Sequence, residues 1–254
     1  MTRFAERATL DTCVPAVEPV AVLDRILAIL DSVKDSGGSR TITELAVQTS
    51  MPKSTVSRLA GTLVEQRYLE RTEDGVALGL RLFELGARAS VPRRLRAAAA
   101  PIIRELWGLT GERIGLWVQS DSEMVAIATV PGRLPMLSTR AGMRSPALTT
   151  ASGKAFLAFC DDHAVVDRIS APLIDDAAAR FRSELSKVRE CAIATDPGIA
   201  YPGILALASP VMSPAGAVIG ALSIAGPDGS MDIDRAGPLV RSAGLDLSRR
   251  LAAA

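Results

Sequence analysis

Apolar residues follow two different periods along the chain, and the change falls near residue 110. From 19 to 110 most of them recur every three or four residues, which is typical of amphipathic helices. Beyond 110 many stand in short runs between turn residues, which is typical of strands. Residues 1–16 follow neither period, and we expect a flexible tail there. The pattern predicts an α+β protein with a helical N-terminal part and a C-terminal sheet flanked by helices.

The most informative pattern lies at residues 51–63. Val56, Leu59, Ala60 and Leu63 form one apolar stripe, and Pro52 suits the first helical position. The opposite face carries short hydroxyl side chains and two cations without any acid, so it is able to approach phosphates and base edges closely. The side chains predicted to contact DNA here and on the neighbouring elements are Thr41, Lys53, Ser54, Thr55, Ser57, Arg58 and Arg71.

The flanking segments support a helix-turn-helix. Thr41-Ile-Thr-Glu44 has the pattern of a capping box that opens a short helix ending near Ser50. Residues 68–78 favour two strands around an Asp74-Gly75 turn, which makes a wing. Two other interpretations remain: a three-helix packing unit with a solvated Ser/Thr face, and a winged helix used for protein contacts alone.

Several segments together resemble the IclR family of bacterial transcriptional regulators. They are Glu44-Leu-Ala-Val-Gln-Thr-Ser-Met-Pro-Lys-Ser-Thr-Val-Ser-Arg-Leu59, Leu63, Tyr68-Leu-Glu-Arg71 and Leu78-Gly-Leu-Arg-Leu-Phe-Glu-Leu-Gly86. The resemblance implies a winged helix-turn-helix DNA-binding domain (17–79), a linker helix (80–92) and an effector-binding domain (93–254). That last domain would hold a mixed sheet related to GAF and PAS folds. The resemblance also implies double-stranded operator DNA as a partner, and homodimers that pair into tetramers.

The pattern places further elements beyond residue 80. A linker helix from Leu80 to Ser90 would be interrupted by Pro92, and a helix over 93–110 would be stopped by Gly111. Strands are expected at Ile114–Val118, Met124–Val130, Pro135–Ser138, Ile193–Thr195, Leu205–Val211 and Val218–Ile224. Helices are expected at Ala151–Phe159, Asp175–Glu190 and Ile233–Leu251.

Charge and composition narrow the class of protein. The net charge is +1, and residues 1–80 carry nine Lys or Arg against eleven Asp or Glu, so any attraction to DNA must be local. Three cysteines without metal-binding spacing suit a reducing cytoplasm. There is no long apolar run and no signal peptide, so we expect a cytoplasmic protein without membrane contact.

Signals for catalysis are weak, and we expect neither an enzyme nor a cofactor. His163 has no second ligand nearby, and Gly153-Lys154 lacks the earlier glycine of a phosphate-binding loop. Ser50-Met-Pro-Lys53 matches S-x-x-K by its letters, but its partner motifs are missing. An enzyme with an accessory winged helix is the alternative function, and it would need a nucleophile and a base that the sequence does not reveal.

The resemblance also implies an effector cavity, with residues 140–155 forming one wall. There Ala151, Ser152 and Gly153 open a helix whose free N–H groups favour a carboxylate, although Gly153 also suits a tight loop–helix junction. The family pattern maps further cavity residues onto Asp196, Ala206 and Ser223.

The expected ligand is an organic acid. The family often has two acids shortly after the Asp, a Cys at the position of Ala206, and a glycine at the position of Ala192. Here Gly198-Ile199 replace the two acids, and these changes favour a more apolar pocket for an aromatic or aliphatic acid.

Overall fold

The computed structural model describes residues 22–133 and 140–253, and its contacts divide the chain between Arg88 and Ala89 into two compact units. The predicted tail (1–16) and the predicted strand Pro135–Ser138 lie outside the described residues. No helix in the described ranges has the length and apolar character needed to cross a membrane.

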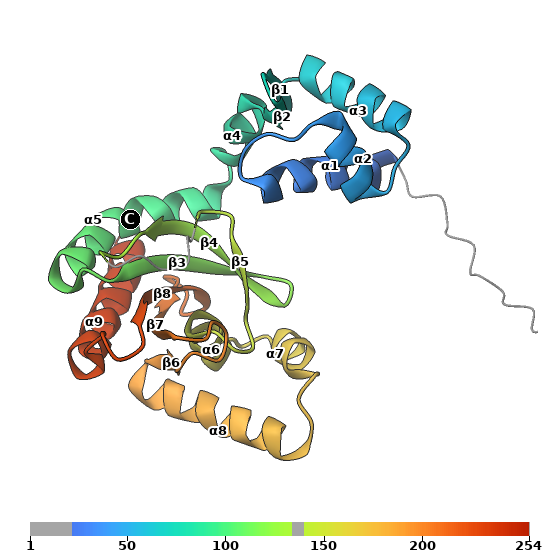
Figure 1. Ribbon diagram of the computed structural model, residues 1–254. Coiled ribbons are helices and arrows are strands. Elements are labelled where there is room, and N and C mark those ends of the chain that lie inside the picture. Colours follow the sequence, from blue (N-terminus) through green and yellow to red (C-terminus); the bar gives the residue numbers. More distant parts are fainter. Residues whose placement is uncertain (1–21, 134–139, 254) are drawn as a thin grey trace, which may run out of the picture. The chain divides into compact units, whose positions relative to one another are not determined.

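The N-terminal unit is a three-helix core closed by a hairpin (Figure 1). Its elements are α1 (Val22–Ser36), α2 (Ile42–Thr49), α3 (Lys53–Glu65), β1 (Leu69–Thr72), β2 (Gly75–Leu78) and α4 (Leu80–Gly86). The predicted apolar stripe of α3 is buried, and it packs against Ile29 and Val33 of α1, Leu45 of α2 and Leu69 of β1. The winged helix-turn-helix is therefore confirmed.

Two details of this unit differ from the prediction. Pro52 precedes α3 as its N-cap, with a non-helical ψ of 136°, and does not occupy the first helical position. In the hairpin Thr72 pairs with Gly75, so Glu73 and Asp74 form the turn. The next residue, Val76, exchanges two backbone hydrogen bonds of 2.9 Å with Arg40. Strand β2 begins at Gly75, so the turn lies one residue earlier than expected.

The C-terminal unit is a six-stranded sheet between helices. Its helices are α5 (Ser90–Thr110), α6 (Ala151–Ala158), α7 (His163–Ser170), α8 (Asp175–Cys191) and α9 (Ile233–Ala252). Its strands are β3 (Arg113–Ser120), β4 (Glu123–Val130), β5 (Arg144–Pro146), β6 (Ala194–Asp196), β7 (Ile204–Met212) and β8 (Val218–Pro227). The strand order is β5-β4-β3-β8-β7-β6. Every pairing described is antiparallel, so the α+β class is confirmed but the expected mixed sheet was wrong.

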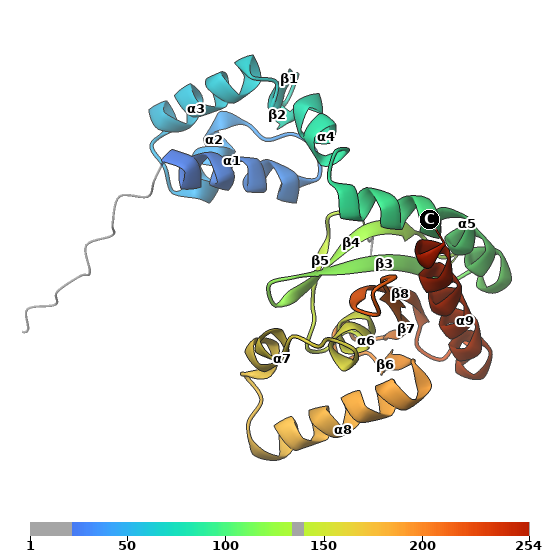
Figure 2. The same cartoon turned by 180° about the vertical axis from the view of Figure 1, so that it is seen from behind.

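The alternation of side chains along the central strands gives the sheet two different faces. Leu205 and Leu207 of β7, with Leu222 and Ile224 of β8, face the large apolar cluster that includes α5 and α9. The intervening residues are small and face α6, which α8 covers from outside (Figure 2). The second face is therefore where a hollow is able to form.

The structure divides the expected linker helix at 80–92 between two helices. Helix α4 ends at Gly86 and α5 begins at Ser90, so the break precedes Pro92. A proline in the first turn of a helix lacks an N–H that would have had no partner there, so Pro92 does not interrupt α5. Gly111 ends α5 with a φ of 69°, as expected.

The sequence patterns did not predict two elements of the C-terminal unit. Helix α7 was missed, although Asp162 caps it by accepting from the N–H groups of Ala164 and Val165. Strand β5 is three residues long, and so short an element carries too few positions to show a period.

Candidate DNA-reading helix and effector cavity

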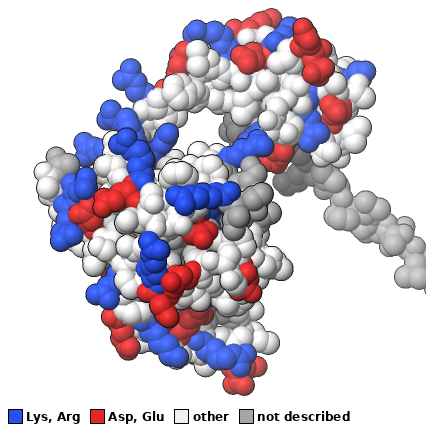
Figure 3. All heavy atoms as spheres, turned by 60° about the vertical axis from the view of Figure 1, so that its left-hand side comes forward, with Lys and Arg blue, Asp and Glu red and all other residues white. Residues whose placement is uncertain are grey.

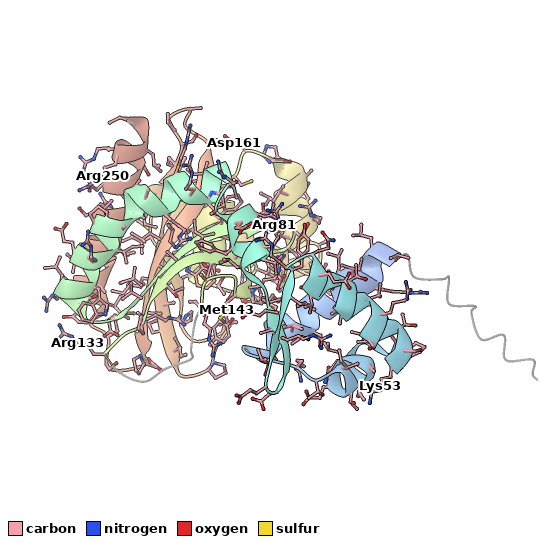
Figure 4. All side chains as sticks on the ribbon, turned by 90° about the horizontal axis from the view of Figure 1, so that it is seen from above. Lys53, Arg81, Arg133, Met143, Asp161 and Arg250 are labelled. Atoms are coloured by element: carbon pink, nitrogen blue, oxygen red, sulfur yellow. The ribbon has the colours of Figure 1, made fainter. Side chains whose placement is uncertain are left out.

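The outer face of α3 presents the side chains that the sequence indicated. Lys53, Ser54, Ser57 and Arg58 are exposed, whereas Thr55 is half-buried. Figure 4 shows Lys53 pointing away from the N-terminal unit. Within the described ranges Lys53 and Arg58 form no salt bridge, so both cations are available to phosphates or base edges.

The capping box at α2 is formed as predicted, and this gives Thr41 a structural role. The Thr41 hydroxyl accepts from the Glu44 N–H at 3.1 Å, and the Thr41 N–H donates to Glu44 Oε2 at 2.8 Å. This backbone hydrogen bond lowers the pKa of the Glu44 carboxyl. Ser50 then adopts a φ of 53°, which turns the chain between α2 and α3.

Charge outside α3 is mixed. Arg71 of the wing is exposed, with Glu70 and Glu73 close by in the sequence. Acidic and basic side chains are interspersed over the face of the molecule shown in Figure 3. Contact with DNA would therefore depend on where individual cations lie.

A small cavity lies on the α6 side of the C-terminal sheet. Strand register aligns Arg113, Ala225, Ala206 and Asp196 across β3, β8, β7 and β6. The next row holds Gly115, Ser223, Ala208 and Ala194. Because paired residues point to the same face, these rows place small side chains beneath a space bounded by Arg113 and Asp196.

Two side-chain hydrogen bonds and one glycine shape this cavity. Trp117 donates its indole N–H to Ser223 Oγ at 2.8 Å. A Cβ atom at Gly115 would stand 2.4 Å from that indole nitrogen, so glycine is required beneath the ring. The hydroxyls of Ser145 and Tyr201 are 2.8 Å apart. These contacts fix an indole in the cavity wall and join strand β5 to the loop before β7.

The two charged ends of the floor have different surroundings. Asp196 is 2% exposed, and its Oδ1 accepts from the N–H groups of Gly198, Ile199 and Ala200 at 3.1, 2.7 and 3.4 Å. Burial lowers the pKa of the Arg113 guanidinium, and the Tyr201 hydroxyl nearby raises it. The cavity thus has one end where a buried carboxylate holds its own loop and another end formed by a cation.

Five of the six predicted effector-site residues line this one cavity: Ala151, Ser152, Asp196, Ala206 and Ser223. Gly153 does not. A Cβ atom there would stand 1.9 Å from the Ala147 carbonyl oxygen, so the glycine permits a close loop–helix contact. Its N–H donates to Thr150 Oγ1 at 3.2 Å, which leaves the N–H groups of Ala151 and Ser152 without an acceptor among the described residues.

Sequence reasoning missed several residues of the same cavity. They are Arg113, Trp117, Tyr201 and Ile204, together with Met143, Ser145 and Thr150, which lie in the predicted wall 140–155 but were not singled out. Alternation along β3 places Arg113, Gly115 and Trp117 on one face, and this was the available signal. This signal alone does not distinguish a cavity wall from the core, because a tryptophan in an apolar strand is usually a core residue.

A second hollow, between α5 and α9, is larger but less suited to a ligand. Its volume is about 280 Å³, and it lies on the opposite face of the sheet. Its lining includes Asp246, which is bonded to Arg250 at 2.8 Å. The smaller cavity has a volume of about 20 Å³, which is room for about one water molecule. The smaller cavity is the better candidate because its polar groups converge from five elements, which are β3, β5, α6, β6 and β8.

A DNA-reading winged helix joined to a domain with a polar-rimmed cavity defines the class of effector-responsive, DNA-binding transcriptional regulators. A family model described as IclR helix-turn-helix domain matches residues 22–73, and one described as bacterial transcriptional regulator IclR C-terminal matches residues 88–249. The chain belongs to the IclR family.

Curated relatives of the chain are named repressors. The HTH-type transcriptional repressor AllR of Escherichia coli (strain K12) is 27% identical over 254 residues, covering 92% of this chain and 93% of AllR. The transcriptional repressor IclR of the same strain is 29% identical over 235 residues, covering 87% of this chain and 85% of that protein.

The fold recurs in solved structures. An IclR homolog from Microbacterium hydrocarbonoxydans complexed with 4-hydroxybenzoate has a TM-score of 0.83 at 24% identity, covering 92% of this chain and all of that one. The Thermotoga maritima IclR has a TM-score of 0.72 at 24% identity, covering 91% and 98%. At these identities the comparison establishes the fold alone.

Proposed function

We propose that this chain is a repressor that reads operator DNA with α3 and releases it when an organic acid enters the cavity of the C-terminal unit. The observation that carries the DNA part is the exposed outer face of α3, which presents Lys53, Ser54, Ser57 and Arg58 and has no acid before Glu65 at its end. The proposal also counts Thr55, Thr41 and Arg71 among the side chains that contact DNA. In this proposal the protein acts in the cytoplasm, and it has no enzymatic activity.

The cavity part of the proposal rests on several groups that attract a carboxylate and line the same space. The N–H groups of Ala151 and Ser152 at the start of α6 provide a partial positive charge, and Arg113 provides a full one. Ala206 and Ser223 have small side chains, so the strands beneath the cavity leave space above them. A ligand that fits one state of the protein better than another shifts DNA affinity by that difference in binding free energy.

Arg58→Ala and Lys53→Ala test the DNA part. If Arg58 holds a base edge, its loss should weaken specific binding by about 1–3 kcal/mol and relax sequence preference. Lys53→Ala should weaken binding to all sequences and flatten the dependence on salt, because a phosphate contact releases counterions. Fluorescence anisotropy with genomic fragments that the protein retains would measure both.

Glu65→Gln is the matched control, since Glu65 is exposed near the end of the same helix. It should leave affinity unchanged or slightly raised, because phosphate repels an acid. Unchanged operator affinity in both the Arg58 and Lys53 variants, with folding intact, would refute α3 as the reading helix.

A further inference from the structure

The charges of the cavity lie at its two ends, and this polarity selects among organic acids. Building on the proposed function, we propose that the effector is a planar aromatic monocarboxylate. Its carboxylate lies on Arg113 and Tyr201, and its ring lies against Trp117 above the floor of small side chains.

The polarity of the cavity comes from the row of paired strand residues that begins at Arg113 and ends at Asp196. Arg113 and Asp196 stand three strand spacings apart, which is roughly 14 Å between their Cα atoms. A guanidinium binds a carboxylate in a paired, charge-assisted geometry. A second carboxylate at the far end would face Asp196, whose charge is buried there. The cavity therefore favours one carboxylate and disfavours two.

Tyr201 completes the carboxylate end. Its hydroxyl is 2.8 Å from that of Ser145, and either oxygen is able to donate. If Ser145 donates, the Tyr201 hydroxyl is left to donate to a ligand oxygen. Arg113, Ser145 and Tyr201 come from β3, β5 and the loop before β7, so a carboxylate held by all three would link these elements.

The shape of the walls favours a ring. Trp117 is 5% exposed and is held by Ser223, so its indole presents a fixed apolar surface. Met143 and Ile204 add apolar surface to the lining. The cavity must widen for any ligand, since its volume of about 20 Å³ admits little more than water. A flat ring stacked on an indole requires less widening than a puckered aliphatic ring.

Calorimetric titration of the full chain with four small probes tests the ligand class. Benzoate should bind, whereas benzamide, which has the same shape without the charge, should bind at least tenfold more weakly. Cyclohexanecarboxylate tests planarity and terephthalate tests the second carboxylate, and both should be weaker than benzoate. Binding of either as tight as that of benzoate, or no binding of benzoate at millimolar concentration, would overturn the proposal.

Arg113→Gln tests the binding group. It should weaken benzoate about 10- to 100-fold, as expected for a charge-assisted hydrogen bond, and leave benzamide unchanged. Arg113→Lys keeps the charge and should retain part of the affinity, and it also serves if the Gln variant folds poorly. Arg241→Gln is the control, because Arg241 is exposed on α9, and it should change nothing.

Ala206→Leu separates the two proposals. A larger side chain on the floor should abolish binding of every probe. If benzoate affinity survives Ala206→Leu, the effector does not use this cavity and the cavity part of the proposed function fails. If Ala206→Leu abolishes binding while Arg113→Gln does not, the cavity stands but the assignment to Arg113 is wrong.

Discussion

At the scale of residues, several side chains predicted to bind a ligand also hold the protein together. Asp196 accepts three backbone N–H groups of its own loop, and Ser223 accepts from Trp117. Substituting either would disturb the loop or the indole as well as any ligand contact. Loss of binding in such variants would not by itself identify a ligand contact.

Ala192 offers a prediction about stability. It ends α8 in the left-handed region with a φ of 56°, a conformation that costs a residue with a Cβ atom about 1 kcal/mol or more. Ala192→Gly should therefore raise the free energy of unfolding of the C-terminal unit by about 1 kcal/mol. Urea unfolding followed by circular dichroism would measure it. Ala179→Gly, at an exposed position inside the same helix, should lower it by about 1 kcal/mol.

At the scale of elements, α6 is held by one buried cation. Lys154 is 3% exposed, and its Nζ donates to Glu184 Oε1 of α8 at 2.7 Å and to the Thr195 carbonyl oxygen of β6 at 2.8 Å. The helix that borders the cavity is thus tied to α8 and to the strand that carries Asp196. Because the Lys154 ammonium has these two partners within the protein, its burial does not require a phosphate ligand.

Glu184→Gln tests this tie. It leaves the buried ammonium with one fewer anionic partner, so the C-terminal unit should lose about 1 kcal/mol of stability. The expected loss is this small because Glu184 is 42% exposed, so that solvent screens the ion pair. Glu190→Gln on the same helix should cost nothing, because Glu190 is exposed. Equal unfolding midpoints for the two variants would show that the ion pair contributes little.

How far the sequence predicted these elements depends on whether the signal was local. The cap at Thr41, the stripe of α3 and the stop at Gly111 all depend on neighbours within a few residues, and all were predictable. The cavity row joins Arg113 to Asp196 through strands that are distant in the sequence, so it depends on register. Family resemblance supplied Asp196, Ala206 and Ser223, but it had no motif for Arg113 or Tyr201.

At the scale of the whole molecule, a single α3 reads too few base pairs to select one operator in a genome, so we expect at least a homodimer, and a tetramer if dimers pair. Helix α4 has the surface for such a contact within the N-terminal unit. It buries none of its residues, and Leu80, Phe83 and Leu85 are 64%, 71% and 48% exposed. Apolar side chains gathered on one short helix are typical of a surface covered by another copy.

Phe83→Glu should weaken this association, because a charge placed in an apolar contact loses its hydration without gaining a partner. Sedimentation of the parent protein at micromolar concentration should show a species of at least twice 26.7 kDa, and the variant should shift toward the monomer. Operator affinity should fall with it, since one α3 would then bind alone. Ile174→Glu is the matched control, because Ile174 is 73% exposed before α8, and it should sediment like the parent. A parent protein that sediments only as the monomer, with or without DNA, would contradict the dimer; a Phe83→Glu variant that stays dimeric would move the contact away from α4.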